Sequence, residues 1–447
     1  MKQIVLLTFM WILMSSIILT SVNGETAVGA STQESSTDFL KGVGEPLTYR
    51  SAWSPEQLNV TKAFEEMRSL NVSRLREWVW RWMVFNETGN GLNENIVESL
   101  NEIVAEAKSQ NITVMGMVQD FPSWMTGIEE NETIQQSVPE RNLIEGSPYK
   151  EFLEKYEESW EMLAGAFPNI AMWEIGNEYN LDSFLHGYNE TDNICTPFNF
   201  SMKVNITTDL LYYGSLGIHE GNPDATTVMC GLGPRLGEIK DFLNATYVNI
   251  NSGGWSSTSP NDFFQIACWH PYFTEEPNFT DWIIQNEAIY EIMKNNSDGN
   301  KPVVFSEMGF SDNSTGFSRE EVADYLNETF RLAKDNFPWL DTIYWFRLID
   351  PDARFDQNLS ESEYGYGLFS LDWCWKPAAT AYSIVPEFPS NIVLSVFMVA
   401  TPLAVIVCRR KRSTHPHTRK ATPTCSSSHR TGCQTFENGF PRSITET

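Results

Sequence analysis

Short apolar runs alternate with longer, charged, helix-like stretches, and this alternation occurs eight times across the middle of the chain. Runs rich in β-branched and aromatic residues predict strands, whereas apolar residues three or four positions apart predict helices. The predicted strands are 39–43, 73–78, 112–118, 170–175, 227–231, 264–269, 303–306 and 342–346. Predicted helices between them include 55–70, 96–109, 149–167, 282–294 and 318–336.

Eight strand-then-helix units favour one fold of the α/β class, a (β/α)8 or TIM barrel spanning residues 37–385. The alternative is an open doubly wound sheet, which often carries a glycine-rich phosphate loop after its first strand. No G-x-G-x-x-G or G-x-x-x-x-G-K motif is present, which disfavours that alternative. Residues 179–225 are predicted to form a long loop that shapes a substrate cleft.

The two ends of the chain predict export and membrane attachment. Residues 1–24 combine Lys2, an apolar run and small residues near Gly24, as a signal peptide does, although an uncleaved signal anchor is the alternative. Residues 391–408 are almost wholly apolar and are followed by a basic run that begins at Arg409. About eighteen apolar residues can cross a ~30 Å hydrocarbon core. A transmembrane helix is therefore predicted, with residues 409–447 as a basic, disordered cytoplasmic tail; a buried core helix is the alternative.

The surface chemistry predicts a glycosylated exterior domain. The formal charge of −27 repels polyanions, so no nucleic-acid partner is expected. Acceptor sequences for N-glycosylation recur only between the two apolar ends, at Asn59, Asn71, Asn86, Asn111, Asn131, Asn189, Asn199, Asn205, Asn244, Asn278, Asn295, Asn313, Asn327 and Asn358. The chain has 7 Cys and no C-x-x-C pair, so one extracellular disulfide is compatible with the sequence but its pairing is open. The expected location is the cell surface, and oligomeric state is left open.

Two glutamates follow predicted strands and are the candidate catalytic groups. Glu178 comes directly after the fourth strand, and Glu307 ends the seventh. Barrel enzymes place their catalytic groups at the C-terminal ends of strands, so these carboxyls are expected at one barrel mouth. Glycosidic cleavage needs one carboxyl to protonate the leaving oxygen and a second to attack the anomeric carbon. Either residue alone is more simply explained as a surface glutamate, but the pair at matching strand ends is not.

The sequence Trp-Glu-Ile-Gly-Asn-Glu at 173–178, together with Ser-Glu-Met-Gly-Phe at 306–310, resembles glycoside hydrolase clan A, the retaining (β/α)8 glycosidases. The resemblance covers about residues 37–385 and extends to features of families 39, 5, 51 and 53. It implies that Glu178 is the acid/base and Glu307 the nucleophile. It also implies substrate-site roles for six further residues: Arg76, with Arg74 as the alternative, Asn177, His270, Tyr272, Trp345 and Trp124.

Within that resemblance, Arg76 would keep the nucleophile ionised and Asn177 would bind the sugar 2-hydroxyl. The hydroxyl of Tyr272 would touch the nucleophile, and Trp345 would form an aromatic floor. Departures are Tyr179, where many members have Pro, and Met308, where Trp or Phe is common. The resemblance therefore implies the clan and not one family.

The leading hypothesis is a retaining glycosidase that cleaves a neutral extracellular oligosaccharide or polysaccharide with no metal and no cofactor. Aromatic residues make up 13% of the chain, with 15 Trp, and aromatic faces stack on sugar rings or fill a core. The tryptophans at 78, 80 and 82 fit either a sugar platform or a core segment. The alternative function is a non-catalytic carbohydrate-binding surface protein on the same barrel. A transglycosylase would share every motif.

Overall fold

A computed structural model describes residues 40–53, 59–129, 135–189, 191–192, 194–273, 276–313, 317–352 and 361–385. All of them belong to one unit, Met1–Pro389, and the rest of the chain forms a second unit, Ser390–Thr447. The expected signal peptide at 1–24, the expected span at 391–408 and the tail at 409–447 lie outside the described residues. Within the described residues, every helix is too short or too polar to cross a bilayer.

Eight parallel strands form the centre of the molecule. In sheet order they are β7 (Thr226–Val228), β4 (Met172–Ile175), β3 (Thr113–Gln119), β2 (Arg74–Trp80), β1 (Leu40–Gly44), β10 (Leu340–Phe346), β9 (Val303–Met308) and β8 (Ala267–Trp269). The outer strands β7 and β8 are joined by a parallel bridge between Val228 and Ile266, which brings the two sheet edges together. The eight predicted strands are therefore confirmed, and the architecture fits a TIM barrel.

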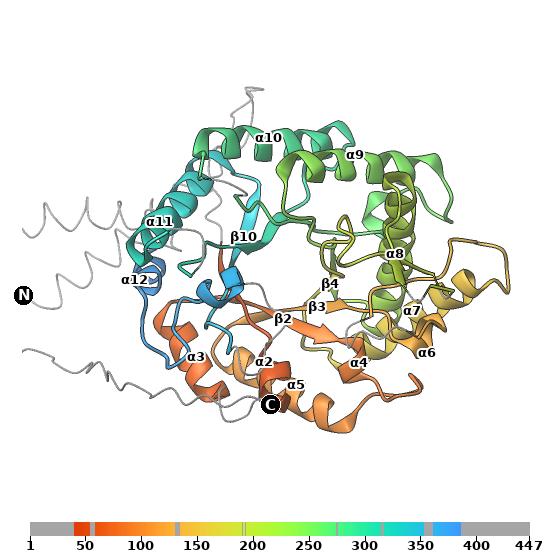
Figure 1. Ribbon diagram of the computed structural model, residues 1–447, viewed down its shortest axis with the longest axis horizontal. Coiled ribbons are helices and arrows are strands. Elements are labelled where there is room, and N and C mark those ends of the chain that lie inside the picture. Colours follow the sequence, from red (N-terminus) through yellow and green to blue (C-terminus); the bar gives the residue numbers. More distant parts are fainter. Residues whose placement is uncertain are drawn as a thin grey trace, which may run out of the picture. The chain divides into compact units, whose positions relative to one another are not determined.

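Helices surround these strands as a ring (Figure 1). They are α2 (Leu47–Trp53), α3 (Val60–Ser69), α4 (Arg81–Val84), α5 (Glu94–Ser109), α6 (Ser123–Thr126), α7 (Pro148–Ala166), α8 (Phe200–Gly221), α9 (Leu236–Ser252), α10 (Phe279–Asn295), α11 (Arg319–Asn336) and α12 (Pro377–Ile384), with short 3-10 turns at η1 (Pro260–Asp262) and η2 (Glu361–Gly365). The five predicted helices are confirmed within a few residues at the ends that the structure describes. Helix α3 begins at Val60, and residues 55–58 of the predicted helix 55–70 lie outside the described residues.

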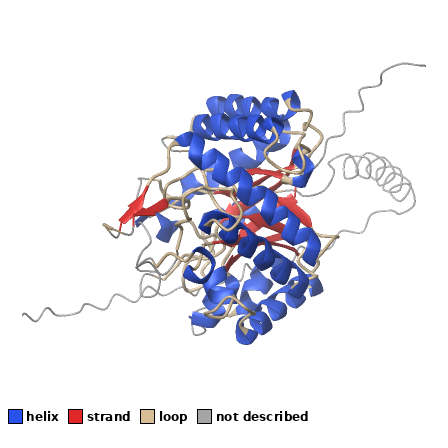
Figure 2. Cartoon of the chain, turned by 90° about the vertical axis from the view of Figure 1, so that its right-hand side faces the viewer, coloured by secondary structure: helices blue, strands red, loops and turns tan. Residues whose placement is uncertain are grey.

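The prediction of one long loop over residues 179–225 is wrong. This segment holds the antiparallel hairpin of β5 (Gly187–Asn189) and β6 (Ile194–Thr196), which lies apart from the central strands (Figure 2), and then the 22-residue helix α8. Helix α8 packs closely on α7: a Cβ at Gly217 would lie 2.1 Å from the carbonyl oxygen of Glu157, and one at Gly221 would lie 2.2 Å from that of Glu161. Glycine lowers helix propensity, so residues that permit this packing also weaken the helical pattern in the sequence.

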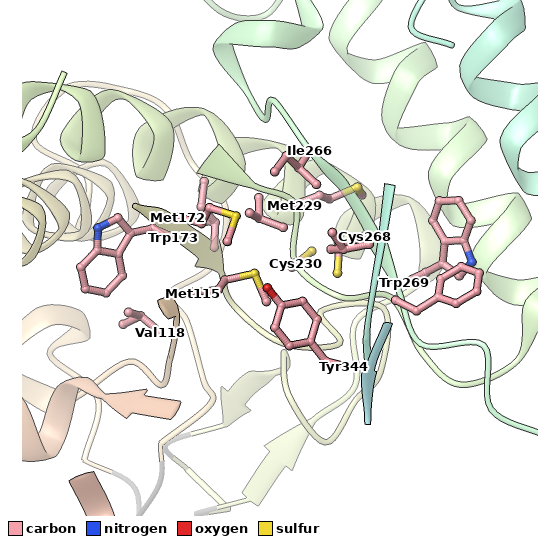
Figure 3. Packing of buried hydrophobic residues seen from close by; sticks show 14 of the residues in the cluster. Met115, Val118, Met172, Trp173, Met229, Cys230, Ile266, Cys268, Trp269 and Tyr344 are labelled. Carbon is pink, nitrogen blue, oxygen red and sulfur yellow. The ribbon is translucent and has the colours of Figure 1, made fainter. Parts of the chain in front are cut away.

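Alternation along the strands separates the barrel interior from the helix layer. Three strand tryptophans point outward: Trp173 packs on Trp160 of α7, Trp269 packs on Trp339, which follows α11, and Trp345 packs on Phe330 of α11. Their neighbours on the strands point inward, and Figure 3 shows the side chain of Cys268 on the opposite side of its strand from that of Trp269. Large rings thus fill the space between strands and helices, while the barrel interior holds polar groups such as Arg76 and Glu174 beside further aromatic side chains.

Helix α11 begins with a capping box. The hydroxyl of Ser318 accepts a hydrogen bond from the Glu321 amide, and the Glu321 carboxylate accepts one from the Ser318 amide. Each bond satisfies an amide that has no partner within the helix.

We expect Ser318→Ala to lower the free energy of unfolding by about 1 kcal/mol, since it removes one half of this box. Ser109→Ala is the matched control: Ser109 is an exposed serine in the last turn of α5 and caps no helix N-terminus. Urea denaturation of the two variants measures the difference. Equal stability of Ser318→Ala and the wild-type protein would contradict the role of the box.

Candidate active site

The two candidate carboxyls meet at the C-terminal ends of their strands. Glu307 lies on β9, and Glu178 follows β4 after a turn in which Gly176 and Glu178 both have positive φ, 90° and 47°. One carboxylate oxygen of Glu178 and one of Glu307 lie within 4.8 Å of each other. Retaining glycosidases place their carboxyls ~5–5.5 Å apart and inverting ones ~6.5–9.5 Å apart. The two carboxyls therefore approach each other closely at one barrel mouth.

The buried guanidinium of Arg76 bonds to the carboxyl of Glu307 and to two further side chains. Arg76 on β2 donates from Nη1 to Glu307 Oε1 over 2.5 Å and from Nη2 to Asn177 Oδ1 over 2.7 Å. Its Nε donates to Glu174 Oε2 over 2.5 Å, and Nη2 also reaches Glu174 Oε1 at 3.2 Å. These contacts show that it is Arg76 that reaches the carboxyls. Arg74, the alternative in the sequence, lies two residues earlier on β2.

The surroundings of Glu307 favour its ionised form. Burial alone would raise the pKa of this carboxyl, but the charges of His270 and Arg76 and the hydrogen bonds from Arg76 and Tyr272 outweigh burial and hold the pKa below its ordinary value. The Tyr272 hydroxyl donates to Glu307 Oε2 over 3.1 Å. A carboxylate that stays ionised and partly accessible is suited to act as a nucleophile.

Glu178 has a different partner. His270, directly after β8, contacts Glu178 Oε1 through Nδ1 at 2.8 Å and Ser306 Oγ through Nε2 at 2.8 Å. The imidazole is fully buried and holds the Glu178 carboxyl through this contact, while the substrate-site role that the resemblance implied for His270 stays a prediction. Glu178 itself keeps a small exposed fraction of 9%, so its carboxyl remains within reach of a ligand.

Two glycines after β7 make room for these groups. A Cβ at Gly231 would lie 2.0 Å from His270 Nε2, and one at Gly233 would lie 1.9 Å from Glu178 Oε1. Backbone groups of the same segment also hold the site, since the Gly231 carbonyl accepts from the Glu178 amide over 2.7 Å. Sequence reasoning missed this segment; the repeated glycines at 231 and 233 were the available signal.

Solved structures with a similar fold include several glycoside hydrolases. A family 39 glycoside hydrolase from the gut symbiont Bacteroides cellulosilyticus WH2 aligns with 17% identity and a TM-score of 0.54, over 79% of this chain and 64% of that one. A GH5_18 protein from Streptomyces cattleya in complex with GlcNAc aligns with 16% identity and a TM-score of 0.52, over 86% and 82%. An exo-beta-1,4-mannosidase from Opitutaceae bacterium strain TAV5 aligns with 14% identity and a TM-score of 0.54, over 79% and 61%.

This chain has the barrel fold of those glycoside hydrolases. It spans less than two thirds of the family 39 and mannosidase structures. No family model matches the chain, and no curated protein sequence matches it.

The structure places two of the expected site residues, Trp345 and Trp124, in packing contacts with other aromatic side chains. Trp345 is fully buried and packs on α11, because the side chain of β10 that points inward is its neighbour Phe346. Phe346 is half-buried and packs edge-on against Trp78 and Tyr366, with ring centroids 5.9 and 5.4 Å apart.

Trp124 on α6 packs on Phe85, with ring centroids 5.2 Å apart, and covers Gly89. These contacts place it against the segment after α4. Of the tryptophans at 78, 80 and 82, Trp78 stacks on the guanidinium of Arg76, 4.8 Å from the ring centroid, so it belongs to the site. Trp80 packs edge-on against Tyr49 on α2.

Two sets of side chains in the described residues lie close enough to share a cation. They are Glu174, Cys268 and His270, and Glu178, His270 and Glu307. Their ligand atoms already bond to one another or to Arg76, Ser306 and Tyr272. Cys230 and Cys268 are free, buried thiols, whereas Cys195 and Cys374 are exposed.

We expect Gly231→Ala to lower the free energy of unfolding by about 1–3 kcal/mol, because the new methyl group overlaps a buried imidazole that cannot move freely. Gly237→Ala is the control: it lies at the start of α9 with open space around its Cβ and should be neutral or slightly stabilising. Chemical denaturation of both variants gives the comparison. A Gly231→Ala protein as stable as the control would show that the ring is not confined there.

Proposed function

We propose that this protein is a retaining glycoside hydrolase that cleaves O-glycosidic bonds by double displacement. The observation that carries the proposal is the close pair of carboxyls at the barrel mouth, with oxygens within 4.8 Å, each in a different electrostatic setting. Glu307 accepts hydrogen bonds from an arginine and a tyrosine, whereas Glu178 shares a hydrogen bond with a histidine. Two carboxyls whose surroundings differ in this way can divide the acid and nucleophile roles between them.

In the first step, the Glu307 carboxylate attacks the anomeric carbon as Glu178 gives its proton to the departing oxygen. The bond between the anomeric carbon and the leaving group breaks, and a glycosyl ester of Glu307 forms. In the second step, Glu178, now ionised, takes a proton from water, and the water oxygen attacks the same carbon. The ester bond breaks, Glu307 is released as a carboxylate, and the sugar keeps its original anomeric configuration.

The groups around the pair support binding of a sugar ring. Asn177 Oδ1 is held by Arg76, which leaves the amide nitrogen to donate to a sugar hydroxyl. Phe346 and Trp78 offer apolar faces beside the carboxyls. Structural neighbours named for a β-1,4-mannosidase and a glucosidase make aryl β-mannosides and β-glucosides the first substrates to test.

The proposal also places the enzyme at the cell surface, held by the apolar segment 391–408. Support comes from the acceptor asparagines, none of which is buried among the described residues. Asn59 and Asn199 cap helices through Oδ1, which accepts from the amides of Lys62 and Met202. Their Nδ2 atoms are not needed for capping, so a glycan there is compatible with the helix ends.

We expect Glu307→Ala to lose hydrolysis by at least about 10⁴-fold, because no covalent intermediate can form. Glu178→Ala should lose about 10²–10⁴-fold on substrates with poor leaving groups. Added azide should restore turnover of dinitrophenyl glycosides by Glu178→Ala, since azide needs no general base. Glu238→Ala, an exposed glutamate on α9, is the control and should retain full activity. Full activity in either site variant, or a wild-type protein that binds glycans without cleaving them, would contradict the proposal.

The stereochemistry of the product tests the mechanism separately. Proton NMR during the first minutes of hydrolysis should show the product anomer with the configuration of the substrate. An inverted first product would mean that water, and not Glu307, attacks the anomeric carbon.

A further inference from the structure

A chain of four polar side chains runs from the barrel interior to Glu178. Glu174 Oε1 lies 2.9 Å from Ser306 Oγ, Ser306 Oγ lies 2.8 Å from His270 Nε2, and His270 Nδ1 lies 2.8 Å from Glu178 Oε1. Glu174, Ser306 and His270 are fully buried. Glu174 and Ser306 have no role in the double displacement described above, so their place in the chain requires an explanation.

The hydrogen-bond partners of Glu174 determine where the hydrogen of Ser306 must point. Both oxygens of Glu174 accept from nitrogen donors: Oε2 from Arg76 Nε over 2.5 Å, and Oε1 from Arg76 Nη2 over 3.2 Å and from the Gly231 amide over 3.1 Å. A carboxylate among such donors has only lone pairs to offer. Ser306 must therefore donate its single hydrogen to Glu174, which leaves its oxygen as an acceptor.

The direction of that bond fixes the hydrogen on His270. Ser306 Oγ can accept from the Cys268 thiol, 2.8 Å away, and from His270 Nε2, but it has no hydrogen left to give. Nε2 must therefore carry the ring hydrogen. In the neutral imidazole, Nδ1 then bears a lone pair, and this lone pair faces Glu178.

We infer that Glu174 and Ser306 are positioning residues that fix the tautomer of His270, so that His270 Nδ1 and Glu178 Oε1 together hold a single proton. The proton lies either on the Glu178 carboxyl or on Nδ1, and in both states one hydrogen bond joins the two groups. The carboxyl that gives a proton to the leaving oxygen would thus have that proton retained beside it in the resting enzyme. The kinetic consequence rests on the proposed function, whereas the assignment of the His270 tautomer is independent of it.

The charges around the ring favour uptake of this proton. The titratable and charged groups that face His270 come from β2, β4, β8, β9 and the segments after β4 and β8: Arg76, Glu174, Glu178, Cys268, Tyr272 and Glu307. Burial alone would lower the pKa of His270, but Glu307 and Glu178 outweigh burial and raise it. The pKa of the Cys268 thiol is raised by burial, so this group stays a neutral donor.

The first test reads the tautomer directly. In the full chain with ¹⁵N-labelled histidines, the ring signals missing from His270→Gln identify His270 among the 6 histidines. We expect a proton on Nε2 at every pH at which the protein is folded, and titration at Nδ1 only. In Ser306→Ala the neutral ring should show both tautomers. A neutral wild-type ring with its hydrogen on Nδ1 would overturn the inference even if the protein is an active glycosidase.

The second test separates positioning from stability. With an unactivated aryl glycoside, Ser306→Ala should lower kcat/KM by about tenfold, a fraction of what a general acid supplies. The alkaline limb of its pH profile should move to lower pH, because the pair loses its proton more easily once the tautomer is free. With a dinitrophenyl glycoside, which needs no acid, kcat/KM should change less than twofold.

The control for this test is Ser311→Ala. Ser311 is a buried serine three residues after β9, and its hydroxyl donates to the Ser362 carbonyl. It should leave the pH profile and the ratio between the two substrates unchanged. A Ser306→Ala enzyme whose alkaline limb does not move, or whose activity falls equally on both substrates, would overturn the positioning role. If no glycoside is cleaved by the wild-type protein, the proposed function fails while the NMR result still decides the tautomer.

Discussion

The arrangement of the site depends on one buried guanidinium. Arg76 has no exposed surface, and a charge removed from water must be compensated by partners of opposite sign. It meets Glu174 and Glu307 on opposite sides of the barrel, and Asn177 between them. A planar donor set with fixed angles determines where each acceptor must lie. The barrel strands bring these side chains into contact, and the guanidinium then sets their separation.

The single positive charge of Arg76 lies between two carboxylates, Glu174 and Glu307, so the pocket keeps an excess of negative charge. Within this pocket the two candidate catalytic carboxyls have different partners. Glu307 receives the arginine and a tyrosine hydroxyl, so its ionised form is favoured. Glu178 is joined to neither donor and instead shares a hydrogen bond with His270. The same strand geometry that brings the carboxyls close therefore gives them unlike partners, which is what a reaction with one acid and one nucleophile requires.

The strands and the carboxyl pair could be predicted from sequence because both depend on local pattern. Apolar runs of the right length mark the strands, and a glutamate directly after such a run marks a side chain at the barrel mouth. The choice between adjacent residues could not be made in the same way. Trp345 and Phe346 are both aromatic and both end β10, and only the closed barrel shows that the tryptophan points toward α11. A shift of one residue along a strand moves a side chain from one face to the other.

Glu174 and Ser306 illustrate the other limit of sequence reasoning. Each precedes a candidate catalytic glutamate in its own motif, where it looks like an ordinary polar residue of a strand end. Their importance arises because β4 and β9 approach across the barrel until Glu174 Oε1 and Ser306 Oγ are 2.9 Å apart. The glycine at 231 contributes in the same indirect way, by leaving the space that the imidazole fills. Residues that act through a neighbour carry no local signature, so they can be found only after the contacts are known, by asking of each buried donor where its hydrogen must go.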